Sequence, residues 1–93
     1  MTIEITNIRF TGTAKNHESI SHYRWRNTAT GGFGTSDKAT LVAWVATAGN
    51  HAFVITNSVR AAVDVVRASQ GMPFLRTQAD GLWSNNLLAL PLF

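Results

Sequence analysis

The chain has 93 residues, of which 45% are hydrophobic and 14% are charged. This length has room for one domain, residues 1–93, and the apolar fraction excludes intrinsic disorder, which requires low hydrophobicity with high net charge. The net charge of +3 is a mild basic bias, and the lack of cysteine excludes disulfides, thiolate nucleophiles and cysteine-ligated metals. Because so short a chain needs its hydrophobic side chains for its own core, we expect it to work through its surface and not through an enclosed active site.

The sequence shows no pattern of a membrane or export segment. Its longest wholly apolar stretch lies within residues 87–93, far short of the roughly 20 residues of a transmembrane helix. Residues 1–5 include an acid and alternate in polarity, which is not the pattern of a secretory signal. We therefore expect a cytoplasmic protein with no membrane partner.

Two strands are predicted in the first 27 residues. Residues 2–10 alternate as a strand, but the phase of the alternation slips, and this slip predicts a β-bulge between Thr6 and Asn7. Residues 20–27 predict the second strand, with one face for packing and one for water. Its two faces carry Tyr23 and Trp25 on one side and His22, Arg24 and Arg26 on the other.

A glycine-rich turn over residues 28–34 and a helix over residues 37–47 follow. Thr35, Ser36 and Asp37 are all suitable N-caps, and Gly49-Asn50 supplies a left-handed stop. A single apolar stripe on the helix predicts that it covers a sheet. The stripe consists of Leu41, Trp44, Val45 and Ala48.

The second half is rich in β-branched residues. It predicts consecutive antiparallel strands over residues 51–56, 60–67 and 74–77, a tight hairpin turn at Asp80-Gly81, and an apolar tail over residues 87–93. The predicted fold is α+β, with a small, antiparallel, strongly curled sheet of about five strands packed on one helix in the order β-β-α-β-β-β.

Three segments resemble a known family: residues 22–31 (HYRWRNTATG), 65–67 (VVR) and, above all, 75–91 (LRTQADGLWSNNLLALP). They are similar to the short stand-alone bacterial and phage proteins called domain of unknown function 3892, over nearly the whole chain. The resemblance implies a compact α+β domain of a few strands and one helix, and it implies no established activity, cofactor or catalytic residue. The hairpin at residues 55–60 and the less charged helix depart from the family's pattern, so a partner that recognises those surfaces would differ here.

The sequence contains few of the residue patterns that are typical of catalytic or metal-binding sites. His17, His22 and His51 lack the spacing of metal ligands, and Asp64 is expected to be exposed or paired with an arginine. Residues 31–34 (GGFG) resemble a phosphate-binding loop before a helix, but the lysine and serine of such loops do not follow, which favours a plain turn. We expect no enzyme, no cofactor and no metal site.

Arginines form the more informative pattern. Arg24 and Arg26 lie two apart on one strand beside His22 and make a short basic stripe. The planar guanidinium fits carboxylates and phosphates, so the stripe favours an acidic protein surface or nucleic acid; the simplest interpretation is a solvated face paired with Asp64 or Glu4. A nucleic-acid interface would use Arg24, Arg26, Arg60, Arg67 and Arg76. Against it stand the low net charge and the alternation of Tyr23 and Trp25 out of phase with the arginines.

The C-terminal segment contains more hydrophobic residues than a short segment readily buries. The simplest interpretation is a tail that closes the sheet, and the alternative is an exposed patch for a protein partner or a homodimer. Our leading hypothesis is a non-enzymatic module that binds a partner protein, as an inhibitor or adaptor if the chain comes from a phage or mobile element. Its candidate contact residues are Trp83, Leu92, Phe93, His22, Arg24 and Arg26.

Overall fold

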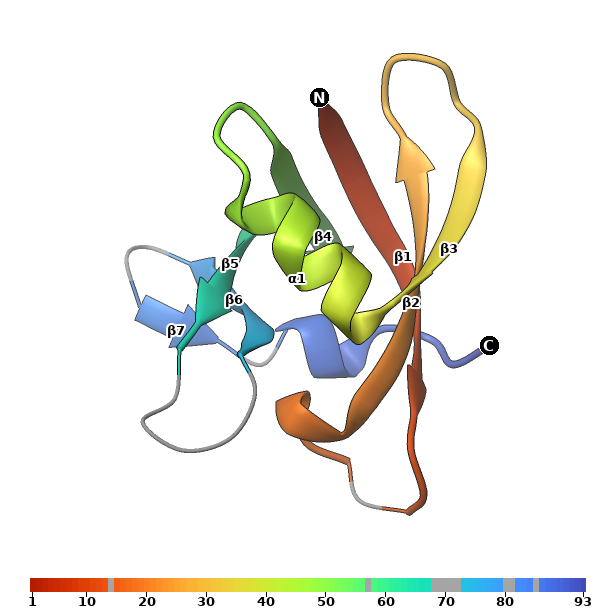
Figure 1. Cartoon of the computed structure of the whole chain (residues 1–93), viewed down its shortest axis with the longest axis vertical. Coiled ribbons are helices and arrows are strands. Elements are labelled where there is room, and N and C mark those ends of the chain that lie inside the picture. Colours follow the sequence, from red (N-terminus) through yellow and green to blue (C-terminus); the bar gives the residue numbers. More distant parts are fainter. Residues whose placement is uncertain (14, 57, 68–72, 80–81, 85) are drawn as a thin grey trace.

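The computed structural model describes residues 1–13, 15–56, 58–67, 73–79, 82–84 and 86–93. Within these ranges the elements follow in the order β1 (Thr2–Phe10), η1 (His17–Ser19), β2 (Ile20–Asn27), β3 (Phe33–Asp37), α1 (Lys38–Ala46), β4 (His51–Thr56), β5 (Val59–Val66), β6 (Phe74–Ala79), β7 (Leu82–Ser84) and η2 (Asn86–Ala89). Here η marks a 3-10 helix. The strands form one sheet, and α1 lies across one of its faces (Figure 1). The α+β class is therefore confirmed.

The sheet is open and mixed, which corrects the prediction of about five strongly curled, antiparallel strands. Seven described strands lie in the order β3-β2-β1-β4-β5-β6-β7. β1 and β4 are parallel, with Ile3 opposite Ala52, whereas the other neighbours are antiparallel. A parallel pair needs a long crossover connection, and β2, β3 and α1 supply it. The order along the chain is β-β-β-α-β-β-β-β, and the predicted Asp80-Gly81 turn lies outside the described residues.

The predicted bulge in β1 is confirmed. The register with β2 shifts between Ile5 and Asn7, so that Thr6 has no opposite residue in the ladder. This extra residue restores the phase of the strand, because a bulge inserts one residue on one strand only. Ile3, Ile5 and Ile8 consequently all point into the core and are buried.

β3 was predicted as a turn with capping residues, and the structure shows why this polar segment pairs as a strand. The indole of Trp25 on β2 lies against Gly34, where an added Cβ would come within 2.4 Å of the ring. Trp25 Nε1 also donates a hydrogen bond to Ser36 Oγ at 3.1 Å. A glycine opposite a large aromatic side chain is a known stabilising arrangement in sheets, and it gives β3 the packing that its own side chains lack.

The predicted helix is confirmed, and both of its ends have side-chain caps. Asp37 is the N-cap, and its Oδ1 accepts a hydrogen bond from the Thr40 backbone N–H at 2.8 Å. Hydrogen bonding to the side chain and then to the backbone of Thr40 holds the pKa of Asp37 below its ordinary value. Beyond the C-terminus, Asn50 Nδ2 donates to the Trp44 carbonyl at 3.1 Å, and Gly49 adopts a φ of 88°. These contacts define where the helix begins and ends.

The buried face of α1 differs slightly from the predicted stripe. Leu41 and Val42 are buried, Trp44 and Val45 are half-buried, and Ala48 is exposed. The apolar face therefore includes Val42 and ends before Ala48, because the helix stops at Ala46.

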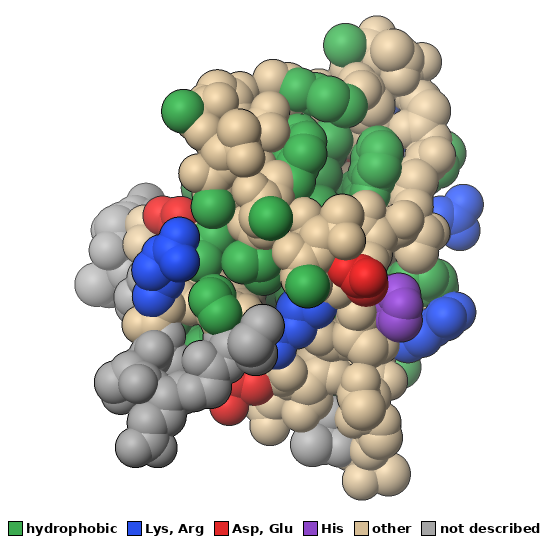
Figure 2. All heavy atoms as spheres, viewed as in Figure 1, with side chains coloured by type: hydrophobic (Ala, Val, Ile, Leu, Met, Phe, Trp, Pro, Cys, Tyr) green, Lys and Arg blue, Asp and Glu red, His purple; other side chains and the backbone are tan. Residues whose placement is uncertain are grey.

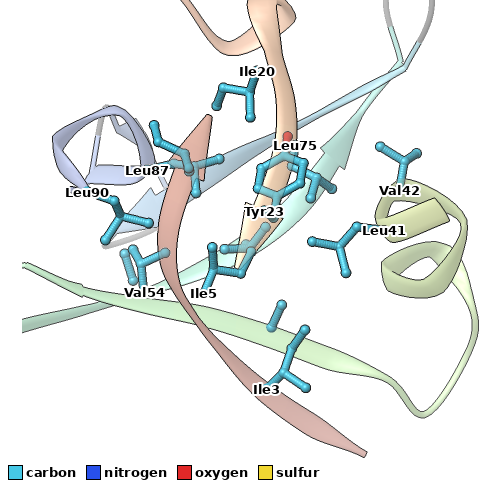
Figure 3. Packing of buried hydrophobic residues seen from close by; sticks show 14 residues of the cluster. Ile3, Ile5, Ile20, Tyr23, Leu41, Val42, Val54, Leu75, Leu87 and Leu90 are labelled. Atoms are coloured by element: carbon cyan, nitrogen blue, oxygen red, sulfur yellow. The ribbon is translucent and has the colours of Figure 1, made fainter. Parts of the chain in front are cut away.

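The core lies between the sheet, α1 and η2. Figure 3 shows Leu41 and Val42 from the helix on one side of Tyr23, with Leu87 from η2 and Leu90 just after it on the other. Fully buried side chains in this cluster are Ile5, Ile8, Tyr23, Val54, Leu75 and Leu87. The Tyr23 hydroxyl has no hydrogen-bond partner among the described residues, and burial raises the pKa of Tyr23.

The C-terminal tail packs against β1 beyond the point where β4 pairs with it. The Ile8 N–H donates to the Pro91 carbonyl at 3.0 Å, and the Phe93 N–H donates to the Ile8 carbonyl at 3.2 Å. Leu87 and Leu90, just before these contacts, are buried. Most of the tail therefore completes the fold.

On the α1 side of the molecule, hydrophobic side chains gather between the helix and the β2–β3 hairpin (Figure 2). They border a small cavity of about 60 Å³ lined mainly by Met1, Ile3, Trp25, Leu41 and Trp44. No helix in the described part of the chain has the length and apolar character to cross a membrane.

Candidate functional site on the outer face of the sheet

The face of the sheet turned away from α1, which we call the outer face, carries the residues that alternate with the core. One row of directly paired residues crosses all seven strands. From β3 to β7 it consists of Phe33, Arg26, Glu4, Phe53, Ala62, Gln78 and Trp83. Paired residues lie on the same face of a sheet, so from β3 to β6 this register brings together side chains that are far apart in the sequence.

Arg24 and Phe33 form a stack at the β3 edge of this face. The Arg24 Cζ lies 5.0 Å from the centroid of the Phe33 ring, within the range of a cation–π contact. Phe33 itself is 59% exposed. The hairpin thus presents a planar cation and an accessible aromatic ring together.

Arg26 is paired on the same face with Glu4 of β1, as one of the two sequence interpretations predicted. The Arg26 Nη2 lies 3.1 Å from Glu4 Oε1, and the two side chains are 37% and 20% exposed. A single half-exposed ion pair contributes little to stability. The pair holds the Arg26 guanidinium between β2 and β1.

A second stack lies across the sheet, between β5 and β4. The Arg60 Cζ sits 3.9 Å from the centroid of the Phe53 ring. Phe53 is only 7% exposed, yet it lies outside the main core cluster. Its burial therefore comes from the outer face, where Arg60 covers it.

A groove of about 490 Å³ opens beside this second stack. Its lining includes Val45 and the buried residues Ala52 and Val63 on the α1 side, and it continues over outer-face residues of β4, β5 and β6. Ala62 lines this groove among longer side chains of β4, β5 and β6, and we call this part of the groove the Ala62 hollow. The polar lining residues are Thr2, Asn50, His51, Arg60, Asp64 and Gln78.

The remaining basic candidates are more dispersed. Arg67 is exposed just after β5, and Arg76 on β6 is half-buried opposite Asp64. Arg76 also lies near His17, a buried residue of η1 that stacks on Phe74 with ring centroids 6.3 Å apart. Desolvation, with a smaller contribution from Arg76, holds the pKa of His17 below its ordinary value.

His22 is half-buried on β2, where its Nδ1 lies 2.9 Å from Ser21 Oγ, and it pairs in register with Asp37. It therefore lies beside Arg24 on the outer face, as the alternation predicted. The three residues of the predicted basic stripe, His22, Arg24 and Arg26, are brought together.

The tail candidates lie beside the end of β1, next to Arg9. Leu92 is 57% exposed, whereas Phe93 is half-buried under Arg9, whose Cζ is 4.5 Å from the ring centroid. Arg9 Nε also donates to the Phe93 carbonyl oxygen at 2.9 Å. Trp83 belongs to β7, and its side chain is not among those described.

The glycine-rich segment is a hairpin turn between β2 and β3. Asn27 Oδ1 accepts a hydrogen bond from the Ala29 N–H at 2.9 Å, and the Gly31 N–H donates to the Asn27 carbonyl at 2.8 Å. β3 separates this turn from the start of α1. The described residues include no group of three or more His, Asp or Glu side chains that could hold a metal ion.

Phe33, Phe53 and Ala62 are the site residues that sequence reasoning missed. On β2 itself, Tyr23 and Trp25 alternate out of phase with the arginines. The aromatic residues that share a face with the arginines come from neighbouring strands. The alternation along β5 indicates from the sequence that Arg60, Ala62 and Asp64 share one face of the strand. What lies across from them depends on the register with β4 and β6.

The sequence model of the family described as Protein of unknown function (DUF3892) matches residues 4–91. The chain belongs to this family. No curated protein and no solved structure matches the chain.

The C-terminal motif that resembles this DUF3892 family serves the fold wherever the structure describes it. Leu75 and Leu87 are fully buried, and Thr77 Oγ1 accepts a hydrogen bond from the Leu87 N–H at 3.3 Å. In this member of the family, the described part of the motif therefore joins β6 to η2. The arginine–phenylalanine stacks lie outside it.

Proposed function

We propose that the chain is a non-enzymatic binding module that holds single-stranded nucleic acid on its outer face. The observation that supports this proposal is the pair of stacks, Arg24 on Phe33 and Arg60 on Phe53, on one face of the sheet. β2 and β5 are three strand spacings apart, which places the two stacks roughly 14 Å from each other.

Single-stranded nucleic acid suits this arrangement because it offers phosphates and unpaired bases at once. Arginine bonds phosphate with its planar fork, while exposed aromatic rings and guanidinium planes stack on bases. By register, five arginines lie on this face with three carboxylates: Arg9, Arg24, Arg26, Arg60 and Arg76 against Glu4, Asp37 and Asp64. The face is therefore locally cationic although the whole chain is only mildly basic.

The test is a fluorescence-anisotropy titration of a labelled single strand of about twelve nucleotides. We expect binding whose affinity falls with salt with a log-log slope of about −2, as for three phosphate contacts. The Arg24→Ala/Arg60→Ala variant should bind about tenfold or more weakly, because each base–cation stack contributes about 1 kcal/mol or more.

Two control variants sharpen the test. Lys15→Ala/Lys38→Ala removes the same charge outside the two arginine–phenylalanine stacks and should weaken binding about threefold or less, through long-range electrostatics only. Arg24→Lys/Arg60→Lys keeps the charge but loses the planar guanidinium. Its affinity should lie between the affinities of the two alanine variants. Absence of binding at low salt, or equal losses in both alanine pairs, would contradict the proposal.

A second candidate follows from the tail. Leu92 is 57% exposed beside a groove of about 380 Å³ that Arg9, Phe10, Lys15 and Phe93 also line. An acidic peptide with one apolar side chain fits a groove of this chemistry. Since Leu87 and Leu90 are buried, this surface is smaller than the outer face. Leu92→Ser should abolish peptide binding and leave the nucleic-acid titration unchanged.

A further inference from the structure

The hollow over Ala62 is bounded by groups that differ from those in the rest of the outer face. Arg60 and Asp64 flank Ala62 at two residues on either side along β5, while Phe53 and Gln78 face it from β4 and β6. All five residues line the groove of about 490 Å³. A cation, a carboxylate, an amide and an aromatic ring therefore surround one small methyl group.

Both charged groups are held by neighbours. The Arg60 Cζ lies 3.9 Å from the centroid of the Phe53 ring, a contact that restricts the guanidinium, and a guanidinium stacked on a ring can still donate its N–H groups to a ligand. Asp64 Oδ1 accepts a hydrogen bond from the Val65 N–H at 2.8 Å, so the carboxylate is oriented at the other end. Asp64 is exposed and retains acceptor capacity.

The spacing of these two groups suits a planar bicyclic ring. Residues four apart on a strand have Cα atoms roughly 13 Å apart. An arginine reaching inward from one end and a shorter aspartate from the other leave room for a purine between them, over the methyl group of Ala62. A single-ring pyrimidine would contact only one end.

We propose that the Ala62 hollow is a recognition site for a guanine base. Guanine presents the acceptors O6 and N7 at one end, which match the arginine fork, and the donors N1–H and N2–H₂ at the other, which match a carboxylate. Adenine would turn its N1 acceptor toward Asp64, which is repulsive. The inference deepens the proposed function, because it assigns a base preference to one position of a bound single strand.

The test uses mononucleotides and the full chain, monitored by isothermal titration and by amide chemical shifts. Guanosine monophosphate should bind about tenfold or more tightly than the adenosine, cytidine and uridine monophosphates, as expected for paired hydrogen bonds to one base edge. Its chemical-shift changes should centre on Ala62 and its neighbours. Equal binding of all four nucleotides, or changes elsewhere only, would overturn the proposal.

An exchange of specificity gives the sharpest readout. Asp64→Asn replaces an acceptor oxygen with an amide donor. The variant should lose affinity for guanosine monophosphate and gain affinity for xanthosine monophosphate, whose C2 carbonyl accepts a hydrogen bond where guanine donates one. A folded Asp64→Asn variant, checked by circular dichroism, that keeps its guanosine preference would contradict the assignment.

A second variant tests the hollow without changing charge. Ala62→Leu fills it from an exposed position and should abolish guanosine monophosphate binding, whereas the matched Ala39→Leu on the exposed face of α1 should have no effect. The two proposals fail separately. Oligonucleotide binding with no guanine preference would contradict only the guanine site. Guanosine monophosphate binding without oligonucleotide binding would contradict only the proposed function.

Discussion

On the α1 side of the sheet, alternate residues of β1, β2, β4 and β5 are buried side chains such as Ile5, Tyr23 and Val54. On the outer face, the residues between them include arginines, carboxylates and phenylalanines. Phe53 shows the difference most clearly, because it is buried under an arginine and not in the main core. The core side gives the chain its stability, and the outer face holds cations over aromatic rings without contributing to that cluster.

The largest expected effect comes from the core side. Leu75 is fully buried, so Leu75→Ala should lower the free energy of unfolding by about 3 kcal/mol through lost burial and a cavity. Urea denaturation measures this loss. The outer-face variant Arg24→Ala should change stability by at most about 1 kcal/mol. If the two variants lost equal stability, the division between the faces would be wrong.

The next largest effect concerns the packing of Trp25 on β3. Gly34→Ala places a Cβ 2.4 Å from the indole, so the ring or the strand must move, and we expect a loss of about 2 kcal/mol. Gly32→Ala is the matched control, because its Cβ would meet its nearest atom at 3.5 Å. A Gly34→Ala protein as stable as the control would show that the indole does not need the glycine.

A smaller, pH-dependent effect comes from His17. Burial lowers its pKa in the folded state from the ordinary 6.5, so the unfolded chain binds the proton more tightly. Its contribution to stability is complete above pH 6.5 and decreases as the pH falls through 6.5 toward the folded pKa. Urea midpoints between about pH 7.5 and 5.5 should decline, and His17→Phe, which keeps a ring against Phe74, should flatten that slope. An unchanged slope in the variant would assign the effect to other groups.

The smallest expected effect is at Tyr23. Its hydroxyl is buried without a hydrogen-bond partner among the described residues, and an unsatisfied buried polar group is unfavourable. Tyr23→Phe should therefore leave stability unchanged or raise it by about 1 kcal/mol. A loss of more than about 1 kcal/mol in thermal or urea unfolding would indicate that the hydroxyl makes a stabilising contact.

Local features of the fold were predictable from the sequence. The phase slip near Thr6 predicted the bulge, and Asp37 predicted the helix start, because both depend on neighbouring residues. β3 was missed because its strand character comes from Trp25 on another strand, which packs on Gly34. The parallel pairing of β1 with β4 was missed because it joins segments almost fifty residues apart.

The candidate site was predictable in part for the same reason. The basic stripe of Arg24 and Arg26 follows from alternation along one strand. The partners Phe33 and Phe53 follow from register between strands, as does the hollow over Ala62. A one-residue change of register would move every one of these side chains to the other face, so the sequence pattern alone could not assemble them.

The most direct test of the central claim compares the two faces in one measurement. Amide chemical shifts of the ¹⁵N-labelled chain would be followed during titration with a guanine-containing single-stranded oligonucleotide at low salt. We predict that the largest changes fall on the outer face, at Arg24, Phe33 and Arg60, while Leu41 and Val42 of α1 stay unchanged. Changes confined to α1 or to Leu92, or no change at all, would contradict it.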